Sequence, residues 1–227
     1  MWKQPRTMFT VVAVGLGLLV GCAGAPPAPT ASQQFEAYPF REAKAKIAIG
    51  VNPCTSQERV KEALPAGADY LAGNILPLQI LLRNDGQDDL FFKVENVRLV
   101  WPDGGLREAL SPAQTYEAIK DEAGGMTYVG LFGVFGVPAM LKQRENVMKE
   151  VMNASAKDRI IGPQKTVTGV LFYPLQDADT SLRGAKIRLV LQNPASLTET
   201  AFELPLSGDL PKNRKSEPPK QPTPERR

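Results

Sequence analysis

The order of apolar and polar residues along the chain predicts a domain built mainly of β-strands. Apolar residues alternate, wholly or largely, with polar ones in residues 43–50, 90–101, 166–173, 185–191 and 197–204, a period of two that is typical of strands with one buried face. Residues 75–83 (ILPLQILLR) are almost continuously apolar, which predicts a central strand covered on both faces. With a short strand over 106–110, the pattern predicts about seven strands.

Three helices are predicted between these strands. Residues 55–58 (TSQE) have the spacing of a capping box, in which the Thr hydroxyl and the Glu carboxylate satisfy backbone N–H groups, and they predict a helix over 56–64. Residues 111–114 (SPAQ) repeat this spacing with proline in the first turn and predict a helix to about residue 122. Residues 142–157 predict an amphipathic helix whose apolar face carries Val147, Met148, Val151 and Met152.

An uncharged run of sixteen residues, 126–141 (MTYVGLFGVFGVPAML), lies between the last two predicted helices. It is shorter than the ~20 residues that a spanning helix needs. We expect either a loop that covers one end of the β-structure or a contact with a partner or a membrane through Leu131, Phe132, Val134 and Phe135. The glycines in this run recur every third residue, which is not the spacing of a phosphate-binding loop.

The N-terminus has the order of an export signal. Lys3 and Arg6 precede an uncharged apolar run over 8–20 that is too short to cross ~30 Å of hydrocarbon comfortably. The run closes on residues 19–22 (LVGC), namely Leu19, Val20, Gly21 and Cys22. We therefore expect residues 1–21 to be removed as a signal peptide.

The LVGC sequence resembles the lipobox of bacterial lipoproteins. This resemblance implies that Cys22 is acylated, becomes the new N-terminus and tethers the protein to a membrane. Residue 23 is Ala, which resembles the pattern of outer-membrane lipoproteins rather than the Asp that retains them in the inner membrane. The expected location is the periplasmic side of the outer membrane, with the inner membrane and the cell surface as alternatives.

The remaining sequence divides into a tether, one domain and a tail. Residues 22–34 contain only small residues and proline up to Ser32, and they predict a flexible tether. Residues 35–210 predict one globular domain with a helical and apolar insertion over 111–161. Residues 211–227 are rich in proline and basic residues and predict a disordered tail.

Composition excludes several classes of chemistry. The chain has no histidine, which excludes His-containing catalytic triads and imidazole metal sites. Its two cysteines are Cys22 and Cys54, and lipidation of the first leaves no partner for a disulfide within the chain and no cysteine cluster for zinc. We expect burial of Cys54, or else an intermolecular bond through it. We predict no metal, no cofactor and no catalytic residue.

The formal charge of +3 does not describe the domain. Loss of Lys3 and Arg6 leaves +1, and the tail holds six basic and two acidic residues, so the domain itself carries about −3. This charge does not favour binding to nucleic acid.

The pair of segments 74–86 (NILPLQILLRNDG) and 91–105 (FFKVENVRLVWPDGG) resembles immunoglobulin-like β-sandwich domains of bacterial envelope proteins. The order of elements is most similar to uncharacterised lipoproteins with a short helix before the first long strand. This resemblance implies a sandwich and brings no catalytic residues. The expected function is a non-catalytic structural, assembly or binding role, in which the lipid-anchored domain docks to another envelope component. The alternative is an envelope hydrolase with a carboxylate-based site.

Overall fold

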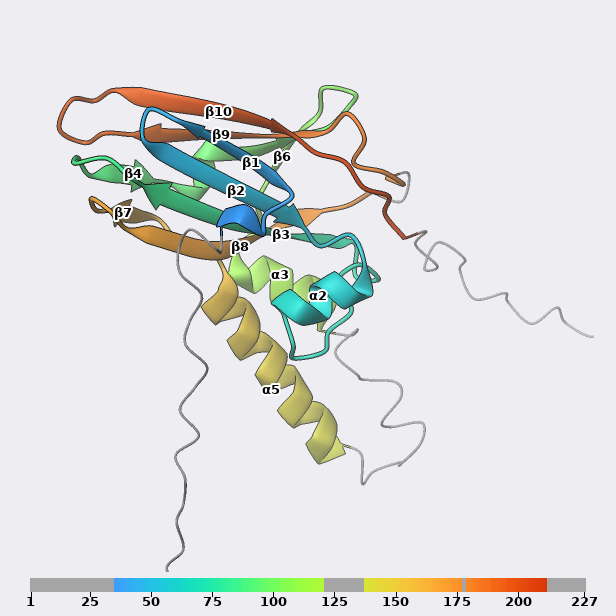
Figure 1. The fold of residues 1–227 in the computed structure, drawn as a ribbon. Helices are drawn as coiled ribbons and strands as arrows, with labels where there is room; N and C mark the ends of the chain where they lie inside the picture. The colour runs from blue at the N-terminus through green and yellow to red at the C-terminus, as the bar shows by residue number, and fades with distance from the viewer. Residues whose placement is uncertain (1–34, 121–136, 177–178, 212–227) are drawn as a thin grey trace, which may run out of the picture.

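The computed structural model describes residues 35–120, 137–176 and 179–211, which form two antiparallel sheets and three α-helices (Figure 1). The first sheet has the strand order β1-β2-β3-β8. Its strands are β1 (Phe40–Lys44), β2 (Ile47–Pro53), β3 (Ile75–Asn84) and β8 (Thr166–Pro174). β3 lies between two neighbours and is buried along most of its length, so the prediction of a central strand is confirmed.

The second sheet has the order β6-β5-β9-β4-β7, and β10 pairs with the remaining edge of β9. Its strands are β4 (Leu90–Phe92), β5 (Val97–Val100), β6 (Leu106–Glu108), β7 (Arg159–Ile161), β9 (Lys186–Gln192) and β10 (Glu199–Pro205). β5 and β4 follow one another along the same edge of β9. β7 was not predicted, because its three residues do not alternate between apolar and polar.

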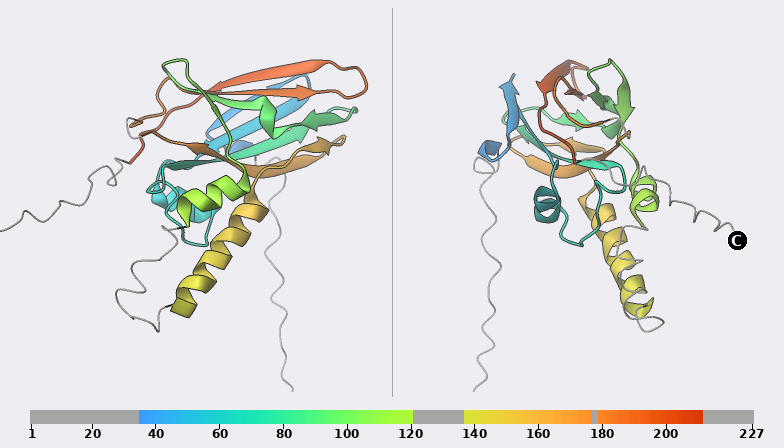
Figure 2. Two further views of the ribbon diagram at one scale, coloured as in Figure 1. Left: turned by 180° about the vertical axis from the view of Figure 1, so that it is seen from behind. Right: turned by 90° about the vertical axis from the view of Figure 1, so that its right-hand side faces the viewer.

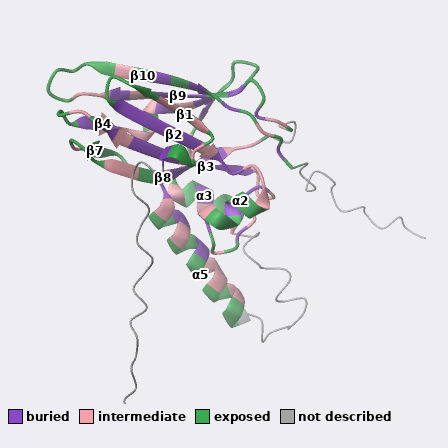
Figure 3. Ribbon diagram, viewed as in Figure 1, coloured by how far each residue is buried: buried purple, intermediate pink, exposed green. Residues whose placement is uncertain are grey.

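The main apolar core lies between the two sheets, as expected for a mainly β protein with a sandwich arrangement, and continues between the first sheet and the helices (Figures 1 and 2). A second, smaller buried cluster contains Phe35, Ala48 and Leu81. In Figure 3 the buried residues, coloured purple, lie mainly in the two sheets. Tyr173 of β8 reaches across the core, where its hydroxyl donates to the carbonyl of Val97 in β5 (3.4 Å). Burial raises the pKa of this phenol.

The first predicted strand is wrong in one respect, because the chain reverses within it. Ala45 and Lys46 have positive φ values of 50° and 60°, and they form a two-residue turn that pairs Lys44 with Ile47. This is the geometry of the hairpin turns that match the right-handed twist of strands. The sequence lacks the Asn-Gly signal that usually marks them, so its alternation alone predicts one continuous strand.

The predicted strand over 90–101 is also divided. A 3₁₀-helical turn, η1 (Val94–Asn96), separates β4 from β5. The backbone N–H of Val94 donates to the carboxylate of Asp158 (2.8 Å), a residue 64 positions further along the chain. The interruption therefore coincides with a long-range contact that no local pattern reveals.

The helices lie beside β3 and β8, on the side of the first sheet that faces away from the second (Figure 2). They are α2 (Gln57–Ala63), α3 (Pro112–Ile119) and α5 (Val137–Ala154). The ring of Tyr70, in the loop after α2, stacks on Phe172 of β8 with centroids 5.6 Å apart. α5 starts five residues earlier than predicted and extends away from the sandwich (Figure 1).

The helix caps were predicted with mixed success. The capping box of α3 is present as expected, with Ser111 and Gln114 bonding reciprocally. The cap of α2 is Ser56 rather than Thr55, and the Ser56 hydroxyl accepts from the N–H of Arg59 (3.4 Å). Adjacent Thr and Ser residues offer equivalent hydroxyls, and sequence spacing alone selected the wrong one.

The fold class is confirmed at the level of a mainly β protein with two sheets and three helices. Ten strands form among the described residues, against about seven expected. Residues 159–161, which the sequence placed in the insertion, form β7 of the second sheet.

Candidate functional site

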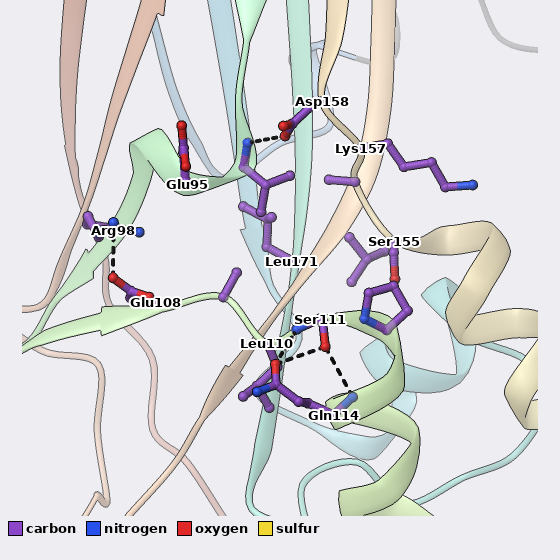
Figure 4. Close-up of a pocket in the computed structure, with 15 residues that line it drawn as sticks. Glu95, Arg98, Glu108, Leu110, Ser111, Gln114, Ser155, Lys157, Asp158 and Leu171 are labelled. Carbon is purple, nitrogen blue, oxygen red and sulfur yellow. Dashed lines mark hydrogen bonds and ion pairs between the residues drawn. The ribbon is translucent and has the colours of Figure 1, made fainter.

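A groove of about 470 Å³ lies at one open edge of the sandwich, where α3 begins and the segment after α5 returns to the sheets (Figure 4). Val170 and Leu171 of β8 form part of its apolar floor. Its charged side chains are Glu95, Arg98, Glu108, Lys157 and Asp158.

Two connecting segments frame this groove. The backbone N–H of Leu110 donates to the carbonyl of Phe172 (2.7 Å), and the N–H of Ala156 donates to the carbonyl of Val170 (2.9 Å). The first segment leads from β6 to α3, and the second leads from α5 to β7. Each segment therefore connects a strand of the second sheet with a helix and bonds β8, the edge strand of the first sheet, on its way. The groove lies between these two segments.

The N-terminus of α3 forms one end of the groove. The Ser111 hydroxyl accepts from the N–H of Gln114 (3.3 Å), and the Gln114 side-chain oxygen accepts from the N–H of Ser111 (2.9 Å). These bonds satisfy backbone donors that would otherwise face the groove. The end of the helix is thus closed by its own side chains.

Two of the three carboxylates of the groove are held by structural bonds. Glu108 pairs with Arg98 across the β5–β6 hairpin (3.0 Å), and Asp158 accepts the N–H of Val94 that begins η1. Figure 4 shows that the charged side chains do not converge, because Arg98 and Glu108 face each other at one wall while Lys157 extends away at the other. The groove therefore offers charges of both signs around an apolar floor.

A buried ion pair fixes the strand that leads into the groove. The guanidinium of Arg107 in β6 bonds the Asp179 carboxylate, with one N–O distance of 3.1 Å, and also donates to the carbonyl of Pro174 (3.0 Å). The same guanidinium lies 4.0 Å from the ring centroid of Trp101. Arg107 thereby joins β6 to the segment after β8. No spacing in the sequence predicts this pair, because its members lie 72 positions apart.

A second carboxylate attaches α5 to the loop after α2. Glu150 accepts from the N–H of Ala66 (2.5 Å) and from the Tyr70 hydroxyl (3.0 Å), while Gln143 donates to the carbonyl of Ala66. Burial raises the pKa of the Glu150 carboxyl, and the bonds from Ala66 and Tyr70 partly oppose that rise. Burial, together with the nearby Glu150 charge, also raises the pKa of Tyr70.

The exposed side of α5 corrects a sequence prediction. Val147 and Val151 are fully buried as expected, but Met148 and Met152 are 42% and 51% exposed. One residue further along a helix turns the side chain by about 100°. Because α5 lies at the periphery, only the valine side of the predicted apolar face contacts the rest of the domain.

The residues that the sequence singled out as sites lie outside the described part of the chain. They are Leu19, Val20, Gly21 and Cys22 of the lipobox, and Leu131, Phe132, Val134 and Phe135 of the apolar run. The signal peptide (1–21), the tether (22–34) and residues 212–227 of the tail fall there as well. The groove was not predicted from sequence, apart from the Ser111–Gln114 capping box at its end.

Among the described residues, Cys54 is buried and free. The same residues contain no group of three or more acidic or cysteine side chains that could hold a metal ion. No helix within them combines the length and the apolar character needed to cross a membrane.

No protein-family model matches the chain, and no curated protein matches it. Among solved structures, the YjhA protein from Bacillus subtilis is 9% identical, with 72% of this chain and 95% of that chain covered and a TM-score of 0.35. A functionally unknown protein from Listeria monocytogenes is 13% identical, with 74% and 80% covered and a TM-score of 0.36. At these identities and TM-scores neither structure assigns a fold family or a function to the chain.

Proposed function

We propose that this chain is a lipid-anchored envelope protein whose immunoglobulin-like sandwich binds a polypeptide segment of another envelope component in the groove between β6 and β7. The lipobox resemblance at residues 19–22 supports acylation of Cys22, and Ala23 supports the periplasmic side of the outer membrane. The observation that carries the binding role is the groove itself, with its apolar floor and charges of both signs.

A polypeptide suits this groove chemically. An extended chain carries apolar side chains for the floor near Val170 and Leu171, and backbone groups that hydrogen-bond to charged side chains. Arg98 can donate to carbonyl or carboxylate oxygens, and Glu95 can accept from N–H groups. Charged side chains of both signs therefore suit a polypeptide, whose backbone has both hydrogen-bond donors and acceptors.

The carboxylates support binding rather than acid–base chemistry. A general acid or base must reach the reacting group, and a hydrolytic pair must face one another at a set separation. Glu108 is bonded to Arg98, and Asp158 is bonded to the backbone at Val94. These contacts give Glu108 and Asp158 structural roles, and the third carboxylate, Glu95, pairs with Lys93 at the surface (3.2 Å).

Site-specific photo-crosslinking in cells tests the proposal. We would place a photoreactive phenylalanine analogue at Lys157, at Glu95 and, as a control, at Leu197, which is 70% exposed in the β9–β10 connection away from the groove. We expect the same adduct at both groove positions and none at the control. Ala109→Trp, which fills the groove, should remove the adduct, whereas Leu106→Trp on the exposed side of β6 should retain it.

The outcomes separate the alternatives. Adducts at Leu197 alone, or adducts that persist with Ala109→Trp, would contradict binding in the groove. Turnover of an envelope polymer by the purified protein that is lost with Glu108→Gln would instead support the hydrolase.

A further inference from the structure

Helix α5 carries a line of exposed apolar side chains. Leu141, Met148 and Met152 are 56%, 42% and 51% exposed, and their spacings of seven and four place them on one stripe of the helix. We call these three residues the α5 stripe. They are half of the six large apolar side chains that are exposed among the described residues. The stripe is separate from the buried side of the helix at Val147 and Val151.

Basic side chains flank the stripe on one side. Lys142 and Lys149 both follow a stripe residue by one position and are exposed. Glu145 is bonded to Lys149 (2.5 Å), and this hydrogen bond holds the pKa of the Glu145 carboxyl below its ordinary value. This side of the helix therefore has two cations and one anion, a net charge of +1, next to an apolar surface.

The position of α5 leaves this surface accessible among the residues that the structure describes. The helix extends away from the sandwich, and its first turns lie furthest from the sheets (Figures 1 and 2). Exposed and half-buried residues line it in Figure 3. A projecting helix can rest on a flat surface without displacing the sheets.

We propose that the α5 stripe inserts into the interfacial region of an anionic phospholipid bilayer and orients the domain on that membrane. Leu and Met side chains would enter the boundary of the acyl chains, while Lys142 and Lys149 reach lipid phosphates. The inference rests on the proposed function for its location, since lipid at Cys22 would hold the domain near the surface. The thirteen residue steps from Cys22 to Phe35 span at most about 45 Å. Such tethering makes a weak second contact effective.

A second copy of the chain fits the stripe less well. In a helix pair with a regular seam, Glu145 would lie between Leu141 and Met148, at spacings of four and three. Packing would then take its carboxylate out of water, which is costly. At a bilayer surface Glu145 is exposed and paired with Lys149 on the flank of the stripe, so its carboxylate stays hydrated among the headgroups.

The experiment uses the mature chain, residues 22–227, coupled through the Cys22 thiol to maleimide lipid in vesicles of phosphatidylethanolamine and phosphatidylglycerol. Chemical coupling replaces enzymatic lipidation, so the result does not depend on whether cells acylate Cys22. Cys54 is buried and does not compete. Met152→Trp provides the reporter, Leu197→Trp is the matched control, and the buried Trp101 is common to both.

We expect the Met152→Trp reporter to shift its emission to shorter wavelength on the vesicles and to be quenched by brominated lipids, while the Leu197→Trp control does neither. Adding the uncharged substitutions Leu141→Gln and Met148→Gln to the reporter should abolish both effects, and high salt or uncharged phosphatidylcholine should weaken them. Circular dichroism would verify that each variant is folded.

Two outcomes would overturn the inference. One is a Met152→Trp reporter that behaves as the control on coupled vesicles. The other is a shift without vesicles that grows with protein concentration, which would assign the stripe to a second copy of the chain. Failure of acylation in cells would contradict the proposed anchor and leave the vesicle result to decide the role of the stripe.

Discussion

The thiol of Cys54 illustrates how burial controls the chemistry of one side chain. Burial, opposed by Arg59 and aided by Glu62, raises the pKa of this thiol to about 11 from an ordinary value of 9.0. The reactive species is the thiolate, and a shift of this size lowers its population about a hundredfold at neutral pH.

We expect the mature Cys22→Ser protein to react with a soluble maleimide at least about a hundredfold more slowly when native than when unfolded in denaturant. Cys54 is then the single thiol, so one modification per chain after denaturation provides the internal control. Rapid labelling of the native protein would contradict the buried position.

Glu150 should make stability depend on pH. Burial is the main cause that raises its folded pKa above the ordinary value of 4.5. The folded state therefore binds the proton of Glu150 more tightly than the unfolded state does. That contribution is fully present below about pH 4.5 and is lost as pH rises through the folded pKa. Relative to Glu150→Gln, the wild-type protein should therefore lose free energy of unfolding across this window, measured by urea denaturation at successive pH values.

Glu145 on the same helix is a control of opposite sign. The hydrogen bond from Lys149 lowers its pKa, so its contribution is present above the ordinary value and is lost as pH falls. Relative to Glu145→Gln, the wild-type protein should therefore gain free energy of unfolding as pH rises, which is the opposite of the trend at Glu150. Equal slopes for the two variants would show that the burial assigned to Glu150 is wrong.

At the scale of elements, the β1–β2 turn stores avoidable strain. Ala45 and Lys46 both adopt the left-handed conformation, which costs a residue other than glycine roughly 1–2 kcal/mol. Asn-Gly is the pair that such a turn favours.

Replacing Ala45→Asn together with Lys46→Gly should raise the free energy of unfolding by about 1 kcal/mol. Urea denaturation provides the measurement, with Ala45→Val as the control that should destabilise the same turn. A loss of stability in the Asn-Gly variant would show that the chain does not reverse at these residues.

At the scale of the whole molecule, one residue should decide where the domain resides. Cys22→Ser should abolish incorporation of labelled palmitate and move the protein from the membrane fraction to the soluble periplasmic fraction. Cys54→Ala is the matched control and should keep both the label and the membrane association. If the Cys22→Ser protein still takes up label, the lipobox interpretation is wrong.

Local patterns predicted much of the secondary structure. The continuous apolar character of β3 predicted its central place, and the alternation near the C-terminus predicted β8, β9 and β10 to within a few residues. The α3 capping box was also correct, because a cap involves residues only three positions apart. Interactions of this kind are complete within a short stretch of sequence.

The mainly β class, the central strand and the α3 cap followed from the sequence alone, since each depends on spacing within one segment. Tertiary structure decided the rest. It selected the valine side of α5 for burial, joined Arg107 to Asp179, and brought two crossing segments beside β8 to form the groove. These features depend on contacts between segments that lie far apart in the chain. The hydrophobic period of one segment does not indicate which other segment it packs against.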